Sequence, residues 1–84
     1  MKWEKIGTTV YATGERTVTY AKGDLRIESR KHRIPHANGE GYWMHTNYVL
    51  IWPDGYSRDF YSLRLAMTAG NEDLEKRGEE HDTV

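Results

Sequence analysis

The sequence predicts an α+β fold, in which a small antiparallel sheet of four or five strands in a meander is packed by one C-terminal α-helix. Three observations support this prediction. Segments rich in β-branched and aromatic residues alternate with glycine-containing turns over residues 2–60. Residues 42–52 form a longer and more apolar strand that must stop before Pro53. After Ser62, small and apolar residues recur at spacings of three and four, as on one face of a helix.

Three strands are expected in the first part of the chain, at residues 2–13, 16–21 and 25–30, with Gly7 interrupting the first. Turns at residues 13–15 and 22–24 separate them, because glycine supplies the positive φ that tight connections require. In the third strand, Leu25 and Ile27 alternate with charged residues. This alternation indicates one buried face and one solvated face.

A long mobile loop is expected at residues 30–41, which are polar and include Pro35 and three turn-forming residues, Asn38, Gly39 and Gly41. Loops of this length carry function more often than strands do, although many are only tolerated insertions.

The strand at residues 42–52 has apolar residues on both faces. Tyr48 and Leu50 alternate with Val49 and Ile51. A strand of this kind lies in the middle of its sheet and is covered at least in part on both sides. The Asp54-Gly55 turn then reverses the chain into a short strand at residues 56–60.

A helix is predicted to begin at Ser62, because the serine hydroxyl can accept a hydrogen bond from a free amide of the first turn. Its buried face should comprise Leu63, Ala66, Met67, Gly70 and Leu74. Gly70 either ends the helix or allows it to approach the sheet closely. We expect residues 1–76 to form a single domain and the charged residues 77–84 to form a frayed tail.

Composition excludes several classes of function. The 84 residues include no cysteine and carry a net charge of −1, so a disulfide or a thiolate metal site is not available. Bulk attraction to nucleic acid or to anionic membrane is also not expected. No apolar segment resembles a signal peptide or approaches the ~20 residues of a membrane helix. We expect a cytoplasmic protein with no cofactor and no small-molecule substrate.

No catalytic or metal-binding pattern stands out. His32 and His36 are four residues apart, but Pro35 prevents the regular helix that would align them. No serine lies in a Gly-x-Ser-x-Gly context, and phosphate-binding, dinucleotide-binding and EF-hand motifs do not occur. We therefore expect a binding protein rather than an enzyme.

The favoured site is the sheet face that the helix leaves uncovered. Trp43, His45, Val49 and Ile51 are expected on that face. Monomeric proteins rarely leave a large apolar patch in water, so we expect a protein partner or a second copy of this chain to cover it. The competing explanation is that the N-terminal segment, with Trp3 and Ile6, folds over the same face.

The alternative site is a basic strand and loop over residues 26–36. Its candidate nucleic-acid contacts are Arg26, Arg30, Lys31 and Arg33, with His32 and His36 beside them. Cations next to aromatic side chains on a sheet suit single-stranded nucleic acid, and a small sheet can also enter a major groove. Two observations count against nucleic-acid binding here, namely the acidic residues Glu28 and Glu40 and the negative net charge. A charged strand face often does no more than face the solvent.

Four features resemble known small proteins over residues 16–70. They are Asp-Leu-Arg-Ile at residues 24–27, the strand rich in Trp and Tyr at 42–52, Pro-Asp-Gly at 53–55 and Phe-Tyr-Ser-Leu-Arg-Leu-Ala at 60–66. This combination resembles small accessory proteins of bacteriophages, actinobacterial phages in particular, and that resemblance implies binding to a host protein. The chain also resembles, more distantly, the arm-binding domains of phage integrases, which read DNA with a three-stranded sheet. Neither resemblance assigns a role to an individual residue.

Overall fold

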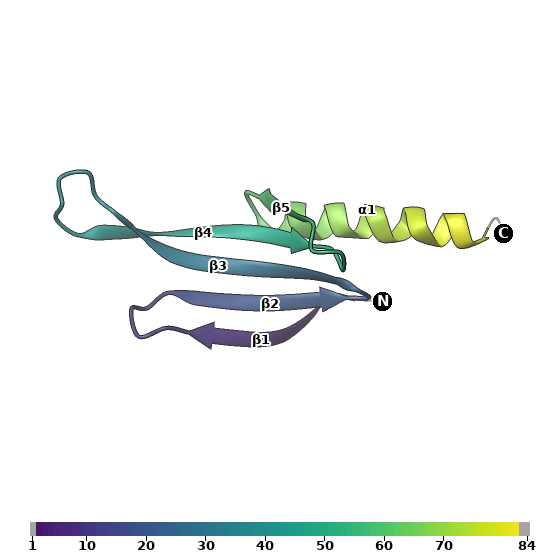
Figure 1. Cartoon of the computed structure of the whole chain (residues 1–84), viewed down its shortest axis with the longest axis horizontal. Coiled ribbons are helices and arrows are strands. Elements are labelled where there is room, and N and C mark those ends of the chain that lie inside the picture. The colour runs from purple at the N-terminus through teal and green to yellow at the C-terminus, as the bar shows by residue number, and fades with distance from the viewer. Residues whose placement is uncertain (1, 83–84) are drawn as a thin grey trace.

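The computed structural model describes residues 2–82, which form one five-stranded antiparallel sheet and one helix (Figure 1). The elements are β1 (Glu4–Val10), β2 (Arg16–Lys22), β3 (Leu25–Pro35), β4 (Tyr42–Ile51), β5 (Ser57–Phe60) and α1 (Leu63–Asp82). The strands lie in sequence order, so the sheet is a meander. The helix α1 packs on β3, β4 and β5. The predicted α+β fold is confirmed.

Cross-strand register places most of the fully buried side chains on one face of the sheet. Ile27 lies opposite Tyr20 on one side and opposite Leu50 on the other. Leu25, Ile27, Leu50 and Ala66 of the helix are fully buried and form the core. The predicted alternation in β3 is therefore confirmed. In β4, Leu50 and Val49 lie on opposite faces and are 0% and 3% exposed, so this strand is buried on both faces at that point, as predicted. We call the face away from α1 the open face.

The helix begins where the sequence predicts. The Leu65 amide donates to Ser62 Oγ over 3.2 Å, which is the N-cap hydrogen bond. The helix does not end at Gly70, where a Cβ atom would lie 2.7 Å from Cζ2 of Trp3, so this glycine permits close packing. Residues 77–82 of the expected frayed tail are helical, and residues 83–84 lie outside the described residues. No helix within residues 2–82 is long and apolar enough to cross a membrane.

Polar contacts fix the helix to distant parts of the chain. The Trp3 indole N–H donates to Asn71 over 3.0 Å. Arg77 donates two hydrogen bonds of 2.9 Å to the carboxylate of Asp24 in the β2–β3 turn. Trp3 therefore packs on the helix side of the sheet, and it does not cover the open face.

The loop expected at residues 30–41 is much shorter than the sequence suggests. β3 continues to Pro35, and His32 and Ile34 pair with His45 and Trp43 of β4. Only residues 36–41 form the loop, which is closed by a 3.2 Å hydrogen bond from the His36 amide to the Gly41 carbonyl. The expectation was wrong because this part of β3 has no buried face, so no apolar alternation marks it as a strand.

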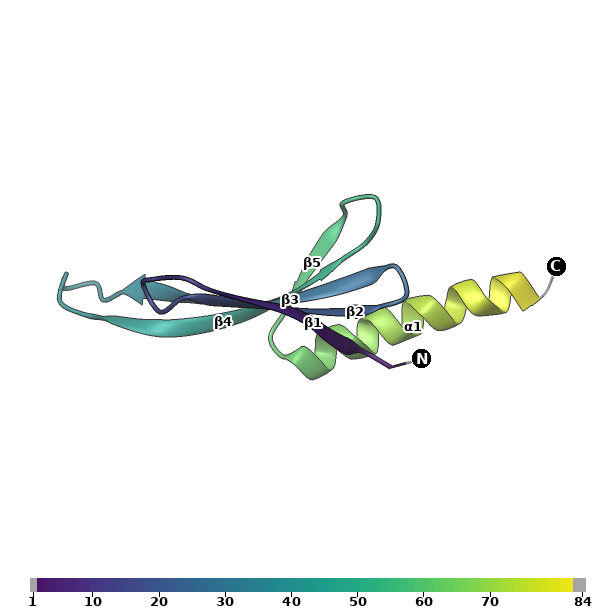
Figure 2. The same cartoon turned by 90° about the horizontal axis from the view of Figure 1, so that it is seen from below.

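The β3–β4 hairpin projects beyond its neighbours and makes the molecule elongated, with extents of 59 × 23 × 21 Å. Pairing with β2 ends at Lys31, and pairing with β5 ends at Tyr48. We call residues 30–47 the ribbon. Figure 2 shows α1 under the other half of the sheet, so both faces of the ribbon are free of the helix.

Candidate nucleic-acid interface

The ribbon concentrates positive charge. It contains Arg30, Lys31 and Arg33 and three of the four histidines, against a single carboxylate, Glu40. Cross-strand pairing brings another cation to its base, because Arg16 of β2 lies directly opposite Lys31. Like charges opposite one another destabilise a sheet. Local stability therefore does not explain this arrangement.

The cations and aromatic rings of the ribbon contact one another. The Arg33 guanidinium lies over the Tyr42 ring, 4.4 Å from its centroid. On the open face, His32 and His45 meet edge to face, with ring centroids 5.4 Å apart. His36 packs in the same manner against Trp43, at 5.0 Å. The pairing of β3 with β4 therefore brings the basic segment next to Trp43 and His45.

Strand alternation divides the predicted basic residues between two faces. Arg26 and Arg30 alternate with Ile27 and so lie on the open face, whereas Lys31 and Arg33 lie on the side of the helix. Arg26 is also four residues back along the strand from Arg30, outside the ribbon. The four basic residues thus lie on both faces of β3 and do not form one flat patch.

Most of this charge is not neutralised within the protein. Arg30 Nε donates to Glu28 over 2.8 Å. Among the side chains that the structure describes, no carboxylate lies within 4.0 Å of the cationic groups of Lys31 or Arg33. Lys31 and Arg33 therefore have no acidic partner among the described side chains, and Arg30 keeps 47% of its side chain exposed beside Glu28, so all three cations can reach an anionic ligand.

The Glu15 carboxylate, immediately before β2, lies beside the ribbon and has a lowered pKa. A 2.8 Å hydrogen bond from the Thr13 hydroxyl lowers the pKa of Glu15 below its usual value, and the Arg33 amide and the positive charges of Arg33 and His32 act in the same direction. The lowered pKa of Glu15 thus comes mainly from the Thr13 hydroxyl and the Arg33 amide, and the positive charge of the ribbon contributes less.

The expected apolar patch on the open face is smaller than the sequence suggests. Trp43 is 59% exposed, and His45 is also exposed. Val49 is only 3% exposed, and Ile51 is half-buried. Val49 lies between Glu28 and Asp59 in the register, and β5 rises on this side of the sheet (Figure 2). Val49 is therefore not available to a partner, and our expectation for this residue was wrong.

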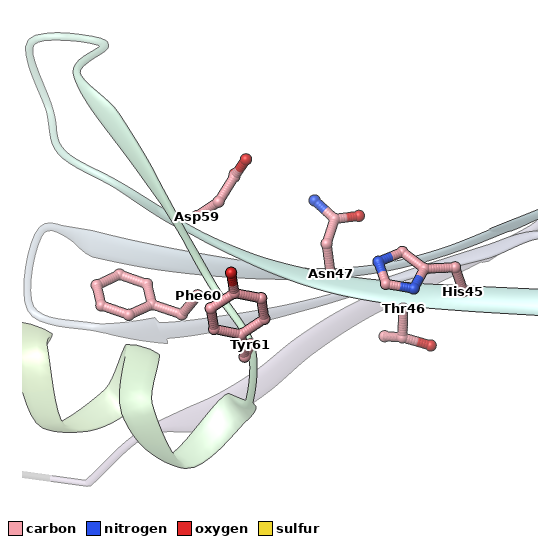
Figure 3. A pocket seen from close by; sticks show the side chains of 6 residues that line it. All are labelled: His45, Thr46, Asn47, Asp59, Phe60 and Tyr61. Carbon is pink, nitrogen blue, oxygen red and sulfur yellow. The ribbon is translucent and has the colours of Figure 1, made fainter.

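A hollow of about 340 Å³ lies between the ribbon and the end of β5. It is lined by His45, Thr46, Asn47, Asp59, Phe60 and Tyr61. Figure 3 shows His45, Asn47, Asp59 and the Tyr61 hydroxyl on one side of the strands, and Thr46 on the other. Sequence reasoning missed Asn47, Asp59 and Tyr61. Asn47 shares the alternation of His45, whereas the position of Asp59 depends on the register of β5.

Within residues 2–82, no three side chains of the metal-ligating types gather into a group that could hold an ion. The arrangement is suited to binding through charge, stacking and hydrogen bonds. No protein-family model matches the chain, and the comparisons with curated proteins and with solved structures found no similar protein.

Proposed function

We propose that this protein binds nucleic acid through the ribbon. The observation that carries the proposal is the projection of a ribbon that is two-stranded beyond Lys31 and has cations on both faces, an exposed indole and one carboxylate. Phosphates would contact Arg30, Lys31 and Arg33, and a base would stack on Trp43. Base stacking on an aromatic side chain contributes about 1–3 kcal/mol.

The net charge of −1 does not oppose this proposal, because the charge is unevenly distributed. The helix carries six carboxylates and three cations, whereas the ribbon carries three cations and one carboxylate. The acidic helix extends away from the ribbon at the other end of the molecule (Figure 1). A nucleic acid on the ribbon would therefore meet positive charge and remain distant from most of the negative charge.

The experiment is a titration of labelled oligonucleotides with the protein at several salt concentrations, in which fluorescence anisotropy measures binding. A triple variant, Arg30→Gln, Lys31→Gln and Arg33→Gln, should bind more weakly and show a smaller dependence on salt. For single strands, the slope of log K against log salt should change by about 2, since each phosphate contact contributes about 0.7.

A control variant makes the same change of net charge elsewhere. It carries Lys2→Gln, Arg64→Gln and Lys76→Gln, all at exposed positions outside the ribbon. The control should keep both the affinity and the salt slope of the unmodified protein. Equal losses in the two variants, or affinity that does not change with salt, would contradict the proposal.

Protein binding is the second candidate. It is favoured by Tyr42 and Trp43, which are consecutive in the ribbon and 49% and 59% exposed. A second copy of this chain or a host protein, as the resemblance to phage proteins implies, would bury these rings. Light scattering in low and high salt separates the candidates. A dimer that persists in high salt and dissociates in Trp43→Asp would favour this second function.

A further inference from the structure

We propose that the hollow beside β5 receives an unpaired guanine base from a single strand bound on the ribbon. This inference rests on the proposed nucleic-acid binding and adds the form of the ligand and the base that is recognised.

The hollow lies where the sheet narrows. β4 pairs with β5 only from Tyr48 to Ile51, so Asn47 and the residues before it have no strand beside them on that side. Asn47 is also directly opposite Arg30 of β3. A single-stranded nucleic acid whose phosphate contacts Arg30 therefore passes next to the hollow. The volume of the hollow, about 340 Å³, is at the small end of the ~300–1,000 Å³ range of ligand pockets.

The groups in the hollow suit a base better than a phosphate. Asp59 is an exposed carboxylate and would repel a phosphate. Tyr61 is 96% exposed, and its ring stands beside the hollow (Figure 3). Aromatic rings at such positions stack on unpaired bases. We therefore place the sugar-phosphate backbone over Arg30 and the base between His45 and Tyr61.

The hydrogen-bonding groups favour guanine. An ionised Asp59 can only accept hydrogen bonds, and guanine presents two adjacent donors, N1–H and the N2 amino group, on its Watson–Crick edge. The Asn47 amide can donate to the O6 atom of the same edge. Neither Asn47 nor Asp59 has a side-chain hydrogen bond to another residue that the structure describes. Both are therefore available to a ligand.

The test compares single-stranded oligothymidylates of equal length with and without one central guanine. The guanine-containing strand should bind about tenfold more tightly, in line with a bidentate contact to one base. Strands with a central adenine or cytosine should not gain this factor. Asp59→Asn should abolish the guanine preference and leave the affinity for oligothymidylate unchanged or slightly higher.

The matched control is Asp54→Asn in the β4–β5 turn, which removes the same charge from the same hairpin outside the hollow. Its side chain can still accept the 2.9 Å hydrogen bond from the Tyr56 amide, so the turn should be kept. This variant should retain the guanine preference.

The possible outcomes separate the two proposals. Salt-dependent binding of all strands without a guanine preference would overturn the guanine site and leave the proposed function intact. No binding of any strand would overturn both. Binding of guanosine monophosphate alone as tightly as the strand, with the same dependence on Asp59, would overturn the requirement for a strand.

Discussion

The contact between Gly70 and Trp3 leads to a prediction in which one substitution changes stability differently in two backgrounds. A Cβ atom at Gly70 would lie 2.7 Å from Cζ2 and 3.0 Å from Cη2 of the Trp3 indole. The indole is held in place by its hydrogen bond to Asn71. Gly70→Ala therefore cannot be accommodated unless the indole or the helix moves.

Two effects of known size compete. Replacing glycine by alanine within a helix stabilises it by about 1 kcal/mol, whereas overpacking a core costs about 1–3 kcal/mol. Gly70→Ala should therefore be neutral or destabilising by up to about 2 kcal/mol in the natural sequence. In a Trp3→Ala background, the clash is absent. The same substitution should then stabilise the protein by about 1 kcal/mol.

The four proteins to compare are the natural sequence, Gly70→Ala, Trp3→Ala and the double variant. Their urea denaturation gives the coupling free energy between the two positions directly. We expect a coupling of about 1–3 kcal/mol between the two positions. Thr68→Ala, at an exposed position of the same helix, serves as the control and should have the same effect in both backgrounds. If Gly70→Ala stabilises both backgrounds equally, the packing argument is refuted.

Three further predictions concern stability. Leu50→Ala removes a fully buried side chain and should lower the free energy of unfolding by about 2–5 kcal/mol, measured in urea. Ser62→Ala should cost about 1 kcal/mol through loss of the N-cap hydrogen bond, and Ser62→Asp should restore most of it. The third prediction concerns pH. Hydrogen bonds from Arg77 lower the pKa of Asp24 in the folded protein, so this ion pair stabilises the protein above the pKa of a free aspartate, about 3.9. The stabilisation is lost as the pH falls through the lower folded-state pKa, and Arg77→Gln should make the acid-induced fall in the urea midpoint shallower.

Local patterns predict much of this fold. Ser62 marks the start of the helix, and the alternation of Leu25 and Ile27 with charged residues identifies the buried face of β3, because both depend only on neighbouring residues. The end of β3 was not predictable in this way, since Arg33 and its neighbours are solvated on both faces. The burial of Val49 depends on how β5 rises from the sheet. The same is true of Asp59, whose place beside the hollow follows from the register that the β4–β5 turn sets.

The division of the molecule into a packed half and a ribbon is itself an argument for function. No residue of the ribbon is fully buried, so core packing constrains its side chains less than those of the other half. A two-stranded hairpin in water is marginally stable at best, and cross-strand pairs contribute only about 0.2–1 kcal/mol each. Residues chosen for stability alone would avoid the opposed cations Arg16 and Lys31 and an indole in solvent at Trp43. Stability alone therefore does not account for these features, and the combination of cations and aromatic rings is the one expected of the nucleic-acid ligand that we propose.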